Sequence, residues 1–143
     1  MNQLERIELS YSSQIYLNSI YQLGRRKGYV RSIDISNDIQ VSKPSVTRAI
    51  RILAEQGMID KNSDGEISLT AAGNEAVEQM HGRYETIKKF FSNAIGRCCV
   101  PSDKEVSKIA YAMSDEVIEA IEASNKDSPA FSASAHFIKD GEE

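Results

Sequence analysis

The chain has 143 residues, of which 41% are hydrophobic and 27% are charged, and its formal net charge is −4. This length suits one domain, or a small domain with a short appendage, and the apolar fraction is sufficient for a hydrophobic core. No run of about 18 apolar residues occurs, and the first residues lack the apolar segment of a secretory signal. We therefore expect a cytoplasmic protein that does not span a membrane.

The charge is distributed unevenly along the chain. Residues 20–62 hold eight basic and four acidic side chains, so this segment carries +4 and the remainder carries −8. The basic residues are Arg25, Arg26, Lys27, Arg31, Lys43, Arg48, Arg51 and Lys61. A basic segment in an acidic protein is compatible with nucleic-acid binding, because the local field matters more than the total charge. The alternative is an ordinary solvated charged surface.

Two helices are predicted before residue 40. Residues 11–23 carry apolar side chains at helical spacing, and Gly24 and then Gly28 mark the end of this helix. Ser32 is placed to cap a short second helix that contains Ile35.

A turn at residues 40–41 leads to a third predicted helix, which Ser42 caps and Gly57 ends. Pro44 is tolerated in the first turn, where its missing N–H has no intrahelical use. The buried stripe of this helix consists of Val46, Ile50 and Leu53. A short helix with small polar and basic groups at its N-terminal end suits the DNA major groove, so the pair of helices reads as a helix-turn-helix.

A two-stranded wing and three further helices complete the predicted elements. Residues 58–61 and 66–69 alternate like strands around a hairpin turn at residues 62–65. Thr70, Ser102 and Ser114 are placed to begin helices that end at about Ala94, Ala112 and Ala123.

Several short motifs occur in a characteristic order. They are Tyr16-Leu17, Ile20-Tyr21, Gly28-Tyr29-Val30-Arg31, Val41-Ser42, Pro44-Ser45-Val46-Thr47, Gly57, Leu69-Thr70 with Gly73, and Ala112-Met113-Ser114-Asp115-Glu116-Val117. This set resembles the diphtheria toxin repressor (DtxR/MntR) family, the iron- and manganese-responsive repressors of bacteria. The resemblance extends over residues 11–123, as in the short, manganese-repressor type.

The resemblance implies a mainly α fold with a winged helix-turn-helix DNA-binding domain over residues 1–72 and a helical dimerisation domain over residues 73–123. We expect a flexible tail over residues 124–143. The implied partners are a second copy of the chain and double-stranded DNA with a palindromic operator, and the protein is not expected to be an enzyme. By position, Ser42, Pro44, Ser45 and Arg48 would face bases, and Lys43, Thr47 and Arg51 would support phosphate or base contacts. The wing adds Lys61, but its carboxylates Asp64 and Glu66 would repel phosphate.

The family also implies a manganese or iron site, which needs carboxylate and imidazole ligands. The corresponding positions here are Ile15, Asn18, Tyr84, Lys88, Ser107, Ala110 and Tyr111, none of which is a good ligand. We therefore predict that the inherited metal site is lost and that no metal cofactor is needed. Instead, we expect hydrophobic contact to hold the DNA-binding domain to the dimerisation domain. The side chains that would converge there are Ile15, Tyr84, Ala110 and Tyr111.

Three alternatives remain open. Glu78, His81 and Glu85 share one helix face and could form a new metal site with Cys98 or Cys99. The simpler interpretation is that this face is a solvated charged surface and that both cysteines are reduced thiols. A small molecule, thiol oxidation or a protein partner could replace the metal as effector. The chain could also be a winged-helix protein-interaction module. The leading hypothesis is a sequence-specific, metal-independent transcriptional repressor.

Overall fold

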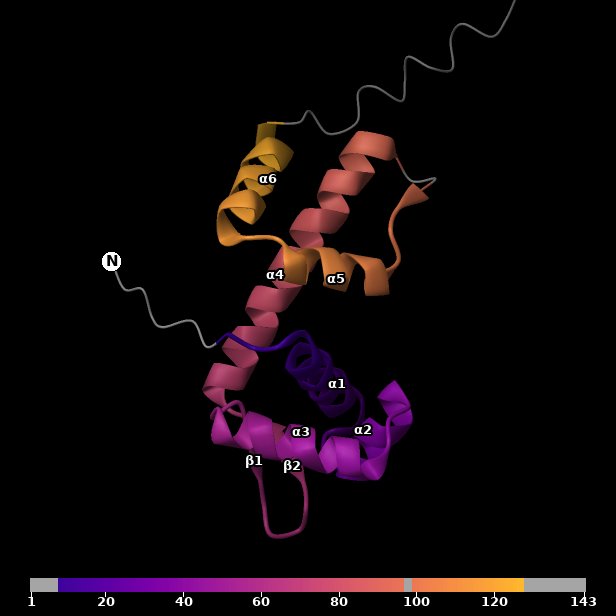
Figure 1. Ribbon diagram of the computed structural model, residues 1–143, viewed down its shortest axis with the longest axis vertical. Coiled ribbons are helices and arrows are strands. Elements are labelled where there is room, and N and C mark those ends of the chain that lie inside the picture. Colours follow the sequence, from indigo (N-terminus) through magenta and orange to yellow (C-terminus); the bar gives the residue numbers. More distant parts are fainter. Residues whose placement is uncertain (1–7, 97–98, 128–143) are drawn as a thin grey trace, which may run out of the picture. The chain divides into compact units, whose positions relative to one another are not determined.

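The computed structural model describes residues 8–96 and 99–127, which are mainly helical and divide into two compact units inside the longest helix, between Met80 and His81. The elements follow in the order α1 (Tyr11–Lys27), α2 (Ser32–Ile39), α3 (Lys43–Glu55), β1 (Ile59–Lys61), β2 (Ile67–Leu69), α4 (Ala71–Ile95), α5 (Asp103–Ala112) and α6 (Asp115–Asp127) (Figure 1). Within the described residues, none of the helices is both long and apolar enough to cross a membrane.

Helix α1 is longer than its apolar pattern predicted. The Ser10 hydroxyl caps its start by accepting the N–H of Ser13 at 3.1 Å. The helix runs through Gly24 and ends at Gly28, whose N–H donates to the carbonyl oxygen of Gly24 at 2.9 Å. Gly28 has a φ of 83°, a left-handed conformation that glycine adopts without a steric penalty. The helix therefore continues past the first of the two predicted glycines and stops at the second.

The predicted cap of α2 is wrong by one residue. Ser32 is the first residue of the helix, and Arg31 occupies the capping position. The Asp34 carboxylate accepts the N–H of Arg31 at 2.8 Å and also pairs with the Lys27 ammonium. The hydrogen bond from Lys27, followed by that from the Arg31 backbone, lowers the pKa of Asp34 below its usual value. The start of α2 is thus stabilised by the Asp34 carboxylate in the first turn, and not by the Ser32 hydroxyl as predicted.

Helix α3 forms as predicted. The Ser42 hydroxyl accepts the N–H of Ser45 at 3.3 Å, and the proline lies in the first turn. The predicted stripe of Val46, Ile50 and Leu53 is buried. Beyond the helix, Gly57 turns the chain with a φ of 73°.

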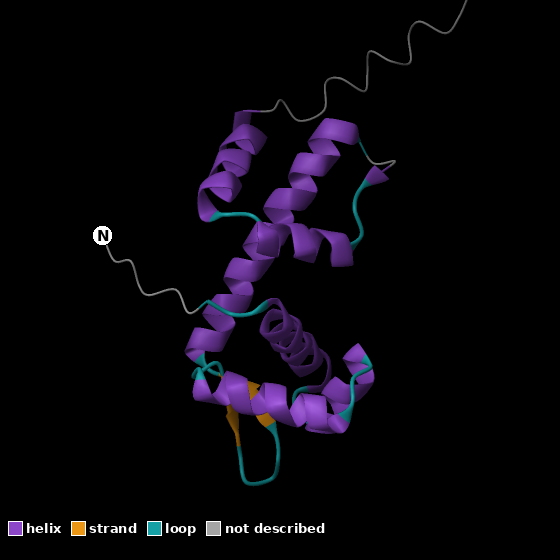
Figure 2. Cartoon of the chain, in the orientation of Figure 1, coloured by secondary structure: helices purple, strands orange, loops and turns teal. Residues whose placement is uncertain are grey.

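The wing is an antiparallel hairpin in which Ile59 pairs with Leu69 and Lys61 pairs with Ile67 (Figure 2). At its tip, the Asn62 side-chain oxygen accepts the N–H groups of Asp64 and Glu66 at 3.0 and 2.9 Å. Val30 adds a bridge that the sequence did not reveal, because its carbonyl accepts the N–H of Ile67 at 2.7 Å. This bridge anchors the wing to the segment between α1 and α2.

A tight junction joins the wing to the start of α4. The Thr70 hydroxyl accepts the N–H of Gly73 at 3.1 Å and donates to the carbonyl of Gly57 at 2.6 Å, which confirms the predicted cap. A Cβ atom on Gly73 would lie only 2.0 Å from the carbonyl oxygen of Met58. Glycine is therefore required here by close approach of the backbone.

The first unit packs around one apolar core, to which its helices and both strands contribute. Fully or almost fully buried members are Leu17, Ile20, Val30, Ile35, Val46, Leu53, Ile59 and Val77. Since α3 gives only one face to this core, its opposite face is left to solvent.

The second unit has a smaller core of its own. Ile87 from α4, Val106 and Ala110 from α5, and Ile118 from α6 are buried together. The predicted cap of α5 is confirmed, because Ser102 and Glu105 exchange hydrogen bonds at the start of the helix. The Ser102 hydroxyl and the Ser102 N–H both donate to the Glu105 carboxylate, and these two hydrogen bonds lower the pKa of Glu105.

Helix α6 extends to Asp127, so the expectation of a tail from Ser124 is wrong for residues 124–127. Asn125 explains the extension: it is buried, and its side-chain amide donates to the carbonyl of Thr86 on α4 at 3.0 Å. The rest of the predicted tail, residues 128–143, lies outside the described residues.

Candidate nucleic-acid interface

The exposed face of α3 carries most of the predicted DNA-binding residues. Lys43, Pro44, Thr47, Arg48 and Arg51 line one open hollow on this face. All of the predicted residues of this helix and its cap are exposed, and so is Lys61 on the wing. Sequence reasoning thus identified which residues of α3 are exposed, because the buried stripe of the helix determines which side chains face outward.

The cations of this surface are available for a partner. Among the described residues, the side chains of Lys43, Arg48 and Lys61 have no hydrogen bond or ion pair. Arg51 lies 4.0 Å from Glu55, but both side chains are about 70% exposed, so the pair is weak. An arginine fork without an intramolecular partner can donate two hydrogen bonds to a guanine edge.

The basic cluster at the end of α1, which consists of Arg25, Arg26 and Lys27, has partners within the protein. Arg26 lies 3.3 Å from Asp38, and Lys27 pairs with Asp34. Arg25 donates to the Tyr21 hydroxyl at 3.0 Å. The two ion pairs join α1 to α2, whereas the Arg25 contact lies within α1.

The hydroxyl groups of α3 are also partly used. The hydroxyl oxygens of Ser42 and Ser45 are 2.8 Å apart and share a hydrogen bond. The Thr47 hydroxyl donates to the carbonyl of Lys43 at 3.1 Å. One serine hydrogen therefore remains for an outside acceptor.

The two wing carboxylates differ in their contacts within the protein. Glu66 accepts a hydrogen bond from the Asn62 side chain at 3.0 Å, and its other carboxylate oxygen lies 4.0 Å from Arg31. Asp64 is exposed at the tip. Arg31 was counted as a basic residue, but its pairing with the wing depends on tertiary structure and could not be read from spacing.

The positions at which the resemblance would place metal ligands divide between the two units. On α1, Ile15 is 38% exposed and Asn18 is half-buried. On α4, Tyr84 packs against the second core, with its ring centroid 6.1 Å from that of His81. Tyr111 on α5 is 46% exposed. The convergence of these side chains on one point stays a prediction.

The donor chemistry at these positions does not fit manganese or iron. Lys88 pairs with Asp103 at 2.8 Å, and this hydrogen bond raises the pKa of the lysine, which keeps it cationic. The Ser107 hydroxyl donates to the carbonyl of Lys104 at 2.9 Å, and Ala110 is a core residue with no side-chain donor atom. An ammonium cation and a hydrocarbon side chain cannot be ligands of a transition metal.

The alternative metal site is not assembled in the part of the chain that the structure describes. No group of three or more His, Cys, Asp or Glu side chains is placed there to hold an ion. Cys98 lies outside the described residues, and Cys99 is an exposed free thiol.

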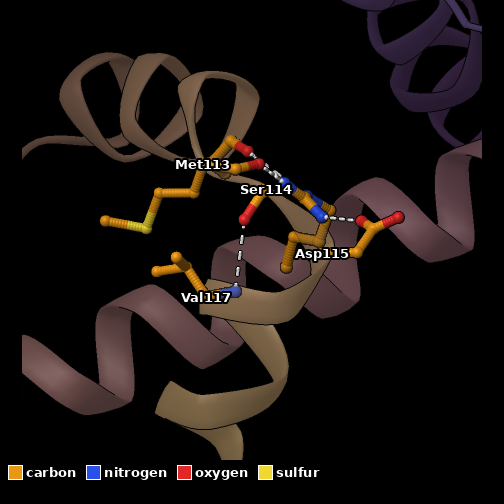
Figure 3. A network of polar contacts seen from close by, with 6 residues as sticks. Met113, Ser114, Asp115 and Val117 are labelled. Carbon is orange, nitrogen blue, oxygen red and sulfur yellow. Dashed lines mark hydrogen bonds and ion pairs between the residues drawn. The ribbon is translucent and has the colours of Figure 1, made fainter.

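A cationic clamp, which we define as Arg83 and its acceptors, joins α4 to the α5–α6 turn (Figure 3). The Arg83 guanidinium donates to the carbonyls of Ala110 at 2.6 Å and Met113 at 2.5 Å, and to the Asp115 carboxylate at 2.7 Å. Its side chain is only 16% exposed. Sequence reasoning missed this residue, because two of its three partners are backbone carbonyls and leave no signal in the sequence.

The first unit is therefore a winged helix whose third helix, α3, exposes a cationic face to solvent. This combination defines a DNA-binding class of protein. Comparison with known proteins gives the same class. Residues 8–66 match the family model described as iron dependent repressor, N-terminal DNA binding domain. The helix-turn-helix transcriptional regulator MntR of Shouchella clausii is 30% identical over 110 residues, which cover 77% of this chain and 76% of the relative. The chain belongs to the DtxR/MntR family of transcriptional regulators, whose members are not enzymes.

Other relatives support the extent of the match. An uncharacterised helix-turn-helix regulator of Methanocaldococcus jannaschii is 24% identical, with 79% of this chain and 91% of the relative covered. The crystal structure of IdeR from T. acidophilum aligns with a TM-score of 0.60 and 26% identity, covering 78% of this chain and 52% of that one. The chain thus spans about half the length of that solved structure.

Proposed function

We propose that the chain is a dimeric, sequence-specific transcriptional repressor that binds a palindromic operator through α3 without activation by manganese or iron. The observation that carries this proposal is the uncovered surface of Lys43, Thr47, Arg48 and Arg51 on a helix whose other face is buried. Arg48 reads a base edge, and Lys43, Arg51 and Lys61 hold phosphates.

Independence from metal is supported by the second unit. Two cations of the chain itself, Arg83 and Lys88, attach α4 to α5 through short hydrogen bonds. The ligand positions on this unit are occupied by Tyr84, Ala110 and other side chains that do not suit a transition metal. The helices of this unit therefore need no added cation to hold them together.

A second copy of the chain is supported by apolar side chains left uncovered on the second unit. Tyr111 and Val117 are 46% and 44% exposed, and Ile95 is 50% exposed. Large exposed apolar side chains are stabilised when a partner removes them from water. We assign these side chains to the dimer contact, as implied for the family.

Selection of bound duplexes from a random pool, with manganese in one arm and a chelator in the other, tests the whole proposal. We expect the same two-fold symmetric sequence from both arms. A sequence enriched only with manganese would exclude metal independence, and an asymmetric sequence would exclude the symmetric dimer. A pool without enrichment in either arm would favour the protein-interaction alternative.

A further inference from the structure

Thr47 has a chemistry that differs from that of the charged residues around it. It lies on the exposed face of α3, in the hollow lined by Pro44, Arg48 and Arg51. Its hydroxyl donates to the carbonyl of Lys43, one helical turn earlier, at 3.1 Å. A threonine hydroxyl has a single hydrogen, so this bond uses the only donor of the side chain.

A phosphate oxygen can only accept hydrogen bonds. Thr47 therefore cannot donate to the DNA backbone while it is bonded to Lys43. The side chain also carries a methyl group, and it lines the same hollow as Pro44. The neighbouring cations already supply what the phosphates need.

In the major groove, thymine is distinguished by its C5-methyl group, which side-chain methyl groups contact. We propose that Thr47 is a specificity-determining residue that selects a thymine in each half-site through methyl–methyl contact. This inference rests on the proposed DNA binding by α3 and adds the base class that one residue reads.

Deoxyuridine tests the contact, because it removes only the thymine methyl group. With the full chain and its selected operator, each thymine of one half-site is replaced in turn, and the dissociation constant is measured by fluorescence anisotropy at fixed salt. We expect one position at which the replacement weakens binding about fourfold, the loss of one buried methyl group.

Two variants identify the group on Thr47 that responds. Thr47→Ser keeps the hydroxyl and removes the methyl, so the deoxyuridine effect should disappear. Thr47→Val keeps the methyl and removes the hydroxyl, so the effect should remain about fourfold. The comparison of protein and DNA changes isolates the pairwise contact.

The opposite pattern would overturn the inference. If Thr47→Val weakens binding to all sequences while Thr47→Ser does not, the hydroxyl contacts a phosphate. If no thymine responds, or if the response survives in Thr47→Ser, Thr47 does not read a methyl group. These results presuppose a selected operator, so failure to obtain one is a separate failure of the proposed DNA binding.

Discussion

The two units preserve their family resemblance in different ways. In the first unit, both the packing pattern and the outward-facing chemistry of α3 match a DNA-binding winged helix. In the second unit the helices remain, but the positions at which we predict the ligands of the family's metal carry other chemistry, such as Lys88 and Ala110. The fold of each unit depends on many apolar residues distributed along its helices. A metal site depends on only a few donor atoms, so these can be replaced while the helices are retained.

The role of chain cations in the second unit is tested by Arg83→Met. This change removes the hydrogen-bond donors to the carbonyls of Ala110 and Met113 and to the Asp115 carboxylate. We expect a loss of about 2–4 kcal/mol in the free energy of unfolding, measured with urea. Lys89→Met, an exposed change on the same helix, is the matched control and should stay within about 0.5 kcal/mol. Equal stabilities of the two variants would show that the clamp contributes nothing.

Gly73→Ala tests the junction that positions the wing in the first unit. The new Cβ would meet the Met58 carbonyl oxygen at 2.0 Å, so the backbone must shift. We expect destabilisation by about 1–3 kcal/mol, measured by thermal or urea unfolding. Gly82→Ala, where nothing lies within 4 Å, should instead stabilise by about 0.5–1 kcal/mol. A neutral Gly73→Ala would contradict the close approach.

Arg48→Ala tests base recognition by α3. We expect the dissociation constant for the selected operator to rise by about 10–100-fold, with a much smaller change for scrambled DNA. Arg48→Lys keeps the charge but loses the planar fork, so it should recover scrambled binding without recovering specificity. A uniform loss on both DNAs would assign Arg48 to phosphate contact.

Asp34→Ala tests the ion pair between Lys27 on α1 and Asp34 on α2. The pKa of Asp34 is lowered in the folded protein, so its carboxylate stabilises the fold above about pH 4 and loses this effect as pH falls through the folded-state pKa. We expect a cost of about 1 kcal/mol at pH 7 that shrinks in acid. Asp60→Ala, on an exposed site of the wing, is the control. A cost that does not change with pH would exclude the carboxylate charge as its origin.

Local signals in the sequence predicted most of the fold. Ser42, Ser102 and Thr70 marked helix starts correctly. Each stands just before a segment with apolar residues at helical spacing, where a side-chain oxygen can accept a backbone N–H of the first turn. The limits of α1 and α6 were less accurate, since Gly24 is tolerated inside a helix and Asn125 is fixed by a contact with Thr86 far along the chain.

For the candidate site, the sequence predicted which residues of α3 are exposed but not which charged side chains contact one another. The exposed residues of α3 followed from its buried stripe, so they could be identified without coordinates. The pairing of Lys27 and Arg31 and the contacts of Arg83 depend on tertiary structure. No spacing rule in the sequence reports which cations are already neutralised.

The central claim is that this family member binds its operator without a transition metal. Titration of the selected operator with the full chain, in chelator and again in manganese or ferrous iron at constant ionic strength, tests it directly. The account predicts dissociation constants that agree within about twofold, a difference of about 0.4 kcal/mol. Stimulation by manganese or iron of about tenfold or more, abolished by the chelator, would contradict it.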